Sequence, residues 1–244
     1  MLFSSAEFIF IFLPFTFFIY FFLARRFSFF YAKGWLLLAS LFFYAYWHPA
    51  NVFIIIFSMV FNFFMGSRLS QSKSKIFLIF GIVTNLGVLF YYKYADFFLA
   101  NINLITGSSF SLLHIILPIG ISFFTFQQIA FLVDSYEGKV PIFPFADYCL
   151  FVTYFPQLIA GPIVHHSEMM PQFLDINNRN FNYDNLTKGF FIFNMGLAKK
   201  IVIADTMAII VNRGYSNSGL LSSLETWFTS ICYSIQLYFD FSGY

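Results

Sequence analysis

The sequence predicts an all-α, polytopic integral membrane protein with about six to eight membrane helices, some of them kinked or re-entrant. Its 244 residues are 59% hydrophobic and only 10% charged, and its mean hydropathy is +0.76. Soluble domains average about 25% charged residues, so these charges are too few to cover a soluble surface of this size. Long uncharged segments also alternate with polar breaks, and we expect one membrane domain over residues 1–244.

The first part of the chain contains four apolar segments that predict membrane helices. In chain order they are Phe8–Ala24, Trp35–Trp47, Val52–Gly66 and Ile76–Tyr92. The first is uncharged and long enough to cross a hydrocarbon core about 30 Å thick at ~1.5 Å per residue. The second is short and ends before Pro49, because proline disfavours helix at the residue that precedes it.

Basic residues set the expected orientation of these segments. They cluster at residues 25–33 and again at residues 68–75. The positive-inside rule places both clusters in the cytoplasm. The N-terminus, the break at His48-Pro49 and residues 93–111 are then expected on the outer side.

A fifth segment, residues 112–133, reads LLHIILPIGISFFTFQQIAFLV. Pro118 and Gly120 predict a kink or a broken helix. Polar residues recur every three positions at Ser122, Thr125 and Gln128. They either form hydrogen bonds between helices or wall a cavity.

Residues 147–163, DYCLFVTYFPQLIAGPI, do not predict a continuous spanning helix, because Pro156, Gly161 and Pro162 interrupt it. A re-entrant or interfacial element is expected instead, since irregular backbone at membrane depth must be buried in protein or line water. Residues 165–188 form the longest polar stretch and predict a loop or a surface helix.

Residues 189–211 are apolar around Lys199, Lys200 and Asp205. Each charge costs about 2.5–3.5 kcal/mol at a bilayer centre on insertion scales, so together they exclude a simple lipid-facing span. The helix is expected either near the interface, with its lysines reaching water, or buried against partner helices. The interface position is the one we favour.

The last segment, residues 224–244, carries a polar stripe on an otherwise apolar helix. Thr229, Tyr233, Gln236 and Asp240 are spaced i, i+4, i+7 and i+11, which places them along one face. Lipid cannot satisfy such a stripe, so it should face other helices or a water-filled path. Asp240 is then either a functional carboxylate or a structural hydrogen-bond partner between helices.

Motif searches exclude several kinds of chemistry. The P-loop, G-x-G-x-x-G and G-x-S-x-G motifs are absent, and a formal charge of +2 is too small to indicate nucleic acid. No histidine pair has helical metal-ligand spacing, so no metal site is expected. His165 and His166 follow the Gly-Pro break and provide either a general base or solvated loop side chains. The residues alone leave an enzyme, a transporter and an assembly partner open.

Four stretches resemble the membrane-bound O-acyltransferase (MBOAT) family, in its bacterial branch of alginate and peptidoglycan O-acetylation proteins. They are MLFSSAEFIFIFLP, ILPIGISFFTFQQIAFLVD, LIAGPIVHHSEMMPQF, and KKIVIADTMA followed by QLYFDFSGY. The second resembles the family's kinked central helix, and the third resembles its Gly-Pro signature loop. The matches occur in the family's order and span nearly the whole chain.

The resemblance implies the N-terminal part of an MBOAT-type fold and the chemistry of an acyltransferase. Members take an acyl group from a cytoplasmic thioester, here acetyl-CoA, and no bound cofactor is implied. They move the acetyl group toward an envelope polysaccharide such as peptidoglycan or alginate, or to a periplasmic or membrane-anchored acetyltransferase partner. The implied location is the lipid bilayer of the bacterial inner membrane, with several passes through it.

The family's catalytic histidine lies in a Trp-His-rich region that follows FDFSGY, beyond Tyr244. The resemblance therefore implies an incomplete and inactive N-terminal portion with no catalytic residue of its own. The candidates for a substrate path are Gln236, Asp240, His165, His166, Gly161 and Pro162. The alternatives are a polysaccharide transporter or flippase, and a non-catalytic membrane scaffold subunit of an envelope polysaccharide complex.

Overall fold

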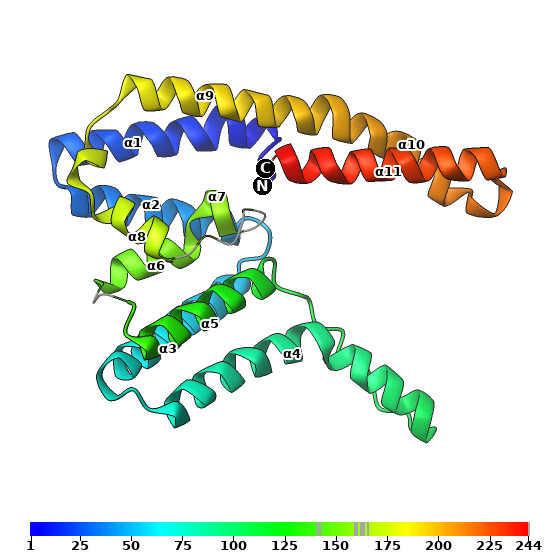
Figure 1. Ribbon diagram of the computed structural model, residues 1–244, viewed down its shortest axis with the longest axis horizontal. Coiled ribbons are helices and arrows are strands. Elements are labelled where there is room, and N and C mark those ends of the chain that lie inside the picture. The colour runs from blue at the N-terminus through cyan, green and yellow to red at the C-terminus, as the bar shows by residue number, and fades with distance from the viewer. Residues whose placement is uncertain (141–142, 159–160, 162–163, 165, 244) are drawn as a thin grey trace. The chain divides into compact units, whose positions relative to one another are not determined.

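The computed structural model describes residues 1–140, 143–158, 161, 164 and 166–243 (Figure 1). Every regular element in these residues is a helix, which confirms the all-α prediction. Three described helices are long and apolar enough to cross a membrane, namely Phe8–Arg26, Asn51–Ser72 and Lys75–Thr106. The helix Phe29–Ala45 is apolar but shorter, so a total of about six to eight membrane helices stays a prediction.

The helices form two compact units. The larger unit, Phe15–Asn180, contains most of α1 (Leu13–Arg26), α2 (Phe29–Ala45), α3 (Asn51–Ser72), α4 (Lys75–Thr106), α5 (Ile121–Glu137), α6 (Phe145–Thr153), α7 (Phe155–Leu158), α8 (His166–Leu174) and the turn η2 (Ile176–Arg179). The smaller unit, Met1–Pro14 and Phe181–Tyr244, contains η1 (Phe8–Phe12), α9 (Tyr183–Ala198), η3 (Lys199–Ala204), α10 (Asp205–Ser216), η4 (Ser218–Leu220) and α11 (Ser223–Gly243). The expectation of one membrane domain stays a prediction.

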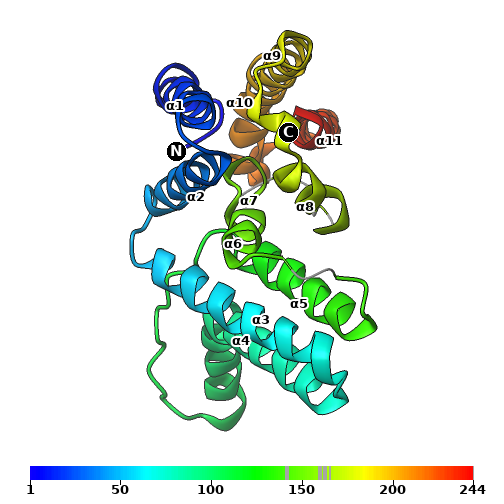
Figure 2. The same ribbon diagram turned by 90° about the vertical axis from the view of Figure 1, so that its left-hand side faces the viewer.

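The core of the larger unit lies where α3, α4 and α5 run side by side (Figures 1 and 2). Nine of the 17 residues of α5 are buried, so this helix is covered on most of its sides. Gly66 allows α3 to approach it closely, because a Cβ atom at this position would overlap the ring of Phe131. Small residues at such crossings are typical of helix pairs in membranes.

A cluster of buried amides links these three helices. The Asn62 side chain of α3 donates to Asn85 Oδ1 of α4 at 3.0 Å, and Asn85 donates back to Asn62 Oδ1 at 2.7 Å. Asn62 also donates to Gln128 Oε1 of α5, which accepts from Ser58 Oγ at 3.0 Å. All three amides are buried. Gln128 was expected either to form hydrogen bonds between helices or to wall a cavity. The structure shows that it forms hydrogen bonds between helices.

Three helix boundaries were predicted wrongly, and one is the end of α3, which continues beyond Gly66 to Ser72. α2 begins at Phe29 rather than Trp35, so Lys33 lies inside a helix and not in the break before it. The reason is a partner distant in sequence, because Lys33 Nζ lies 2.6 Å from Asp147 Oδ1 of α6. α4 continues beyond Tyr92 to Thr106.

The proline and glycine breaks fall close to where the sequence placed them. Pro118 and Gly120 precede α5, and Gly120 adopts a positive φ of 72° that favours glycine. The fifth segment is therefore helical only from Ile121 onward. In residues 145–158 the structure has only the short helices α6 and α7, and the interruption falls at Tyr154, two residues before Pro156, which lies in α7.

We predict that Asn62→Leu destabilises the larger unit. The substitution removes the donor to Asn85 Oδ1 and one of the two donors to Gln128 Oε1, and a buried unsatisfied group costs roughly 1–3 kcal/mol. Thermal unfolding of the purified protein in detergent should show a lower midpoint. Thr84→Ala is the control, because the Thr84 hydroxyl donates only within its own helix, to the Phe80 carbonyl at 2.8 Å. Equal midpoints for the two variants would contradict the prediction.

Candidate functional site

The smaller unit is built on an antiparallel pair of helices, in which α11 runs beside η3 and α10 (Figure 1). Local signals fix where these helices begin. Asn182 Oδ1 accepts from the backbone N–H of Asp184 and Asn185 and so caps α9. Ser222 and Glu225 form a capping box before α11, since the Ser222 N–H donates to Glu225 Oε2 at 2.8 Å.

The polar stripe of α11 faces the neighbouring helices. Thr229 is buried against Gly214 of α10, where a Cβ atom would overlap the threonine side chain. The ring of Tyr233 meets that of Tyr215 edge-on at 5.9 Å. Asp240 at the end of the stripe reaches Lys200 of η3. The stripe therefore lines the contact between α11 and the η3–α10 helix.

Four charged groups gather at this contact. Lys200 Nζ lies 2.6 Å from Asp240 Oδ1 and 3.1 Å from Asp205 Oδ1. The neighbouring Lys199 Nζ donates to Ser242 Oγ at 2.8 Å. Both lysines thus contact α11, and the position of their helix relative to the membrane interface stays a prediction. We refer to Lys199, Lys200, Asp205 and Asp240 as the charged cluster.

A π-helical turn places the two lysines on this side. η3 covers Lys199–Ala204, between the α-helical segments α9 and α10. A π-turn accommodates an extra residue in one turn of helix, and such turns occur frequently at functional sites. The wider turn lets two consecutive lysines point toward the same partner helix.

Two glycines bring the backbones together beside the cluster. A Cβ atom on Gly196 would overlap the carbonyl oxygen of Gly243, and one on Gly243 would lie 3.0 Å from the carbonyl oxygen of Gly196. Only residues without a side chain permit this approach. The glycine crossing therefore sets how closely Lys200 and Asp240 meet.

A pocket of about 310 Å³ lies next to the crossing. Its walls come from three segments of the smaller unit, with Lys200 as the one charged residue among Phe3, Ser4, Gly189, Ile192, Phe193, Gly196, Leu197, Lys200 and Gly243. Gln236 lies one turn before Asp240, and its side-chain oxygen is buried without a hydrogen-bond partner in the described residues. The site thus combines an apolar pocket, a lysine held by two carboxylates and an unused hydrogen-bond acceptor.

The Gly-Pro segment belongs to the larger unit. Gly161 is buried in a tight turn, where a Cβ atom would lie 2.6 Å from the Cα atom of Gln157. His166 begins α8 and is 3% exposed, and its Nδ1 lies 3.4 Å from Asp134 Oδ2 of α5. His166 is therefore a buried partner of a carboxylate and not a solvated loop side chain. Pro162 and His165 lie outside the described residues.

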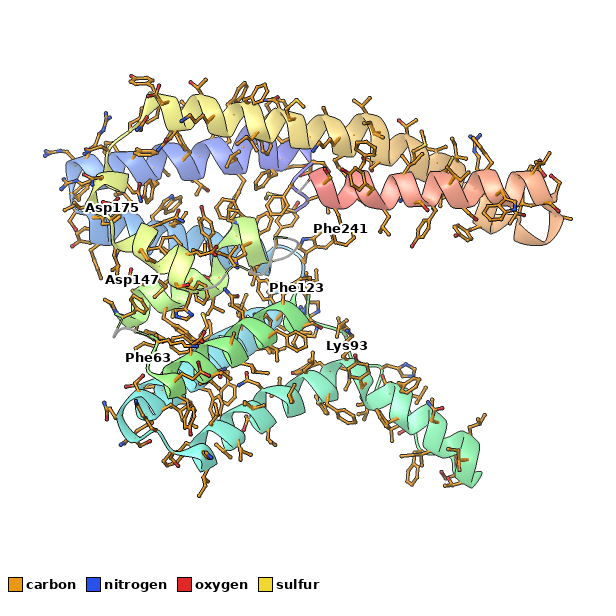
Figure 3. All side chains as sticks on the ribbon, in the orientation of Figure 1. Phe63, Lys93, Phe123, Asp147, Asp175 and Phe241 are labelled. Carbon is orange, nitrogen blue, oxygen red and sulfur yellow. The ribbon has the colours of Figure 1, made fainter. Side chains whose placement is uncertain are left out.

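Sequence reasoning did not find the carboxylates that pair with Lys33 and His166. Asp134 continues the buried face of α5. Phe131 follows Gln127 by four residues on this face, and Asp134 follows Phe131 by three. That periodicity was a usable signal. Asp147 is 1% exposed, and nothing in its local sequence points to its partner Lys33 (Figure 3).

Known proteins resemble this chain along its whole length. Residues 138–244 match the sequence model of MBOAT, the membrane-bound O-acyltransferase family. The chain is 46% identical to a peptidoglycan O-acetyltransferase of Helicobacter pylori and 37% identical to a probable alginate O-acetylase of Pseudomonas aeruginosa. Each similarity covers 100% of this chain but 52% and 47% of the relative. The chain therefore spans about half the length of these curated relatives.

We predict that Gly196→Val separates α11 from η3. The new side chain would overlap the Gly243 backbone, and overpacking of this kind costs roughly 1–3 kcal/mol. Thermal unfolding in detergent should show a lower midpoint than for the unsubstituted chain. Gly189→Val is the matched control, because it puts the same residue into α9 where no atom lies within 4 Å of the new Cβ. A similar loss of stability in both variants would contradict the close crossing.

Proposed function

This chain belongs to the membrane-bound O-acyltransferase family, and from this premise we propose that it forms the N-terminal half of a membrane O-acetyltransferase. The enzyme passes acetyl groups from a cytoplasmic thioester donor, acetyl-CoA, toward an envelope polysaccharide. Two relatives are named for acetyl transfer to peptidoglycan and alginate, and the proposed acceptor belongs to this class of polymer.

The observation that carries the proposal is the charged cluster beside the pocket. Two lysines and two carboxylates balance in charge, which lowers the cost of holding them at membrane depth. A path for a polar acyl donor through a membrane needs polar walls inside the protein. We assign Asp240 and Gly243 to the scaffold that shapes this path near the donor.

Acetyl transfer requires a general base, and we do not assign that role to the charged cluster. In acetyl transfer the carbon–sulfur bond of the thioester breaks, an ester bond forms to the acceptor hydroxyl, and the hydroxyl proton passes through a base to the leaving thiolate. A hydroxyl is a weak nucleophile until that proton is removed. The described residues of the smaller unit supply the wall and the charge balance, and the base belongs to the other half of the proposed enzyme.

The proposed setting is the bacterial inner membrane. The basic residues at 25–33 and 68–75 favour a cytoplasmic position for those stretches. The donor is then reached from the cytoplasm and the acceptor from the outer side. A periplasmic or membrane-anchored acetyltransferase is the proposed partner that receives the acetyl group where the polymer does not receive it directly.

We predict that Asp240→Ala impairs acetyl transfer much more than membrane insertion. Introduced into a chain that also contains the C-terminal half present in the relatives, it should lower transfer from labelled acetyl-CoA by about tenfold, which corresponds to ~1.4 kcal/mol of lost transition-state stabilisation. The yield of membrane-inserted protein is measured in parallel. Asp184→Ala is the control, since Asp184 is an exposed carboxylate at the start of α9 in the same unit.

A double variant tests whether Asp240 lines the substrate path or only holds two helices together. Lys200→Met with Asp240→Met removes both charges together, and a partly exposed ion pair contributes only about 0–1 kcal/mol to stability, so the double variant should fold. If the double variant folds and transfers acetyl groups normally, Asp240 serves packing alone. If purified protein moves polysaccharide without consuming the acetyl donor, the transporter alternative replaces the enzyme.

A further inference from the structure

The second half of α4 runs in a different direction from the first half. With 32 residues, α4 is about 48 Å long at ~1.5 Å per residue, and a hydrocarbon core is only about 30 Å thick. The helix changes direction near Lys93 (Figures 1 and 3). Residues 94–106 therefore form a separate arm and not a continuation of a straight span.

A segment without regular secondary structure is hydrogen-bonded along this arm. Residues 108–117 contain neither helix nor sheet. The Asn103 side chain donates to the Phe110 carbonyl at 2.8 Å and accepts from the Phe110 N–H at 2.9 Å. Seven residues earlier, on the same helix face, the Asp96 carboxylate accepts from the N–H groups of Leu113 at 2.6 Å and Ile115 at 3.2 Å. We call residues 94–117 the α4 hairpin.

The outside of the α4 hairpin is mainly apolar. Residues 97–117 contain no Asp, Glu, Lys or Arg. Exposed polar side chains are fewer and uncharged apart from His114, and they are Asn101, Thr106, Ser109, Ser111 and His114. The large exposed apolar side chains come from both the helix and the returning segment, and they are Phe97, Phe98, Ile102, Leu104, Ile105, Phe110, Leu112, Leu113, Ile116 and Leu117. Leu104 is 85% exposed and Ile105 is 81% exposed. A contiguous surface of this composition marks a site that binds another apolar phase.

The irregular backbone of the hairpin limits how deeply the hairpin can lie in a membrane. Irregular backbone does not face hydrocarbon, because its free N–H and C=O groups would have no partner there. The side chains, in turn, are poorly suited to bulk water. The boundary between headgroups and acyl chains satisfies both, since it supplies apolar volume and hydrogen-bonding groups together. Tyr91, Lys93 and Tyr94 flank the bend, and such residues anchor helices at this boundary.

We propose that the α4 hairpin is a membrane-surface anchor that lies in the headgroup–acyl boundary, with a phospholipid bilayer as its binding partner. The Asp96 and Asn103 side chains hold the hairpin together, because they form hydrogen bonds with backbone groups of residues 110–115. The apolar side chains are then free to contact lipid. The hairpin lies at the end of α4 remote from the basic residues at 68–75, so the leaflet it occupies is the outer one. This inference stands whether or not the proposed function holds.

Spin labels measure the depth of the hairpin directly. Single cysteines replace Val83, Leu104, Phe110 or Lys139 in a chain whose Cys149 and Cys232 are changed to alanine, and nitroxides are attached in phosphatidylcholine vesicles. Oxygen in the lipid and a nickel chelate in the water report the depth of each label. We expect Leu104 and Phe110 at one shared depth near the headgroups, Val83 near the bilayer centre and Lys139 in water.

Two results would overturn the anchor. A straight α4 would move each label about 1.5 Å further out per residue, so a Leu104 label as open to the chelate as Lys139 means that the arm projects into water. Labels at Leu104 and Phe110 shielded from both reagents mean that a second copy of the chain or another protein covers the surface.

The role of Asp96 has its own test. Asp96→Leu removes the acceptors for the N–H groups of Leu113 and Ile115. A nitroxide on a cysteine at Leu113 should therefore become more mobile, while the Val83 label is unchanged. Asp96→Asn keeps one acceptor oxygen and should restore much of the order. Asn101→Leu is the matched control on the same arm, because its side chain bonds only within the helix, to the Phe97 carbonyl at 2.7 Å. Equal mobility at Leu113 in all three variants would rule out the role of Asp96.

Discussion

The structure depends on one constraint, which is that polar groups in so apolar a chain must find their partners within the protein. Lipid offers no hydrogen bonds, so an unpaired group at membrane depth is costly. The amides of Asn62, Asn85 and Gln128 meet one another across three helices, and Lys33 meets Asp147. Because apolar faces pack against lipid and protein alike, these few polar groups specify which helix faces come together.

The sequence predicts those elements whose signal is local. Phe8–Ala24 is an uncharged run of membrane length, and α11 is marked by its apolar pattern with a polar stripe on one face. The start of α2 and the end of α4 depend on contacts distant in sequence. Lys33 reads as a loop charge until Asp147 is placed beside it, and residues 94–106 gain support from the strand that returns along them. Neither pairing has a local signature.

The candidate site shows the same division. The spacing of Thr229, Tyr233 and Asp240 is enough to place them on one face of a helix. What that face meets could not be read from α11 alone, since the lysines of η3 were compatible with an interfacial helix as well. The close glycine crossing and the π-turn bring these lysines to α11, and both are properties of backbone geometry that residue spacing does not reveal.

The two lysine–carboxylate pairs also differ in a way that bears on their roles. In the larger unit, Lys33 and Asp147 have side chains that are 18% and 2% exposed, whereas Lys200 and Asp240 of the smaller unit are 28% and 34% exposed. A pair that only holds helices together gains strength from the exclusion of water, because a low dielectric strengthens the attraction. A pair that lines a path must stay open on one side. The charged cluster has that open side, and Lys200 also forms part of a pocket wall. The two pairs are thus built from the same chemistry, but the first is closed to water, as a link between helices requires, and the second is open, as our proposal of a path wall requires.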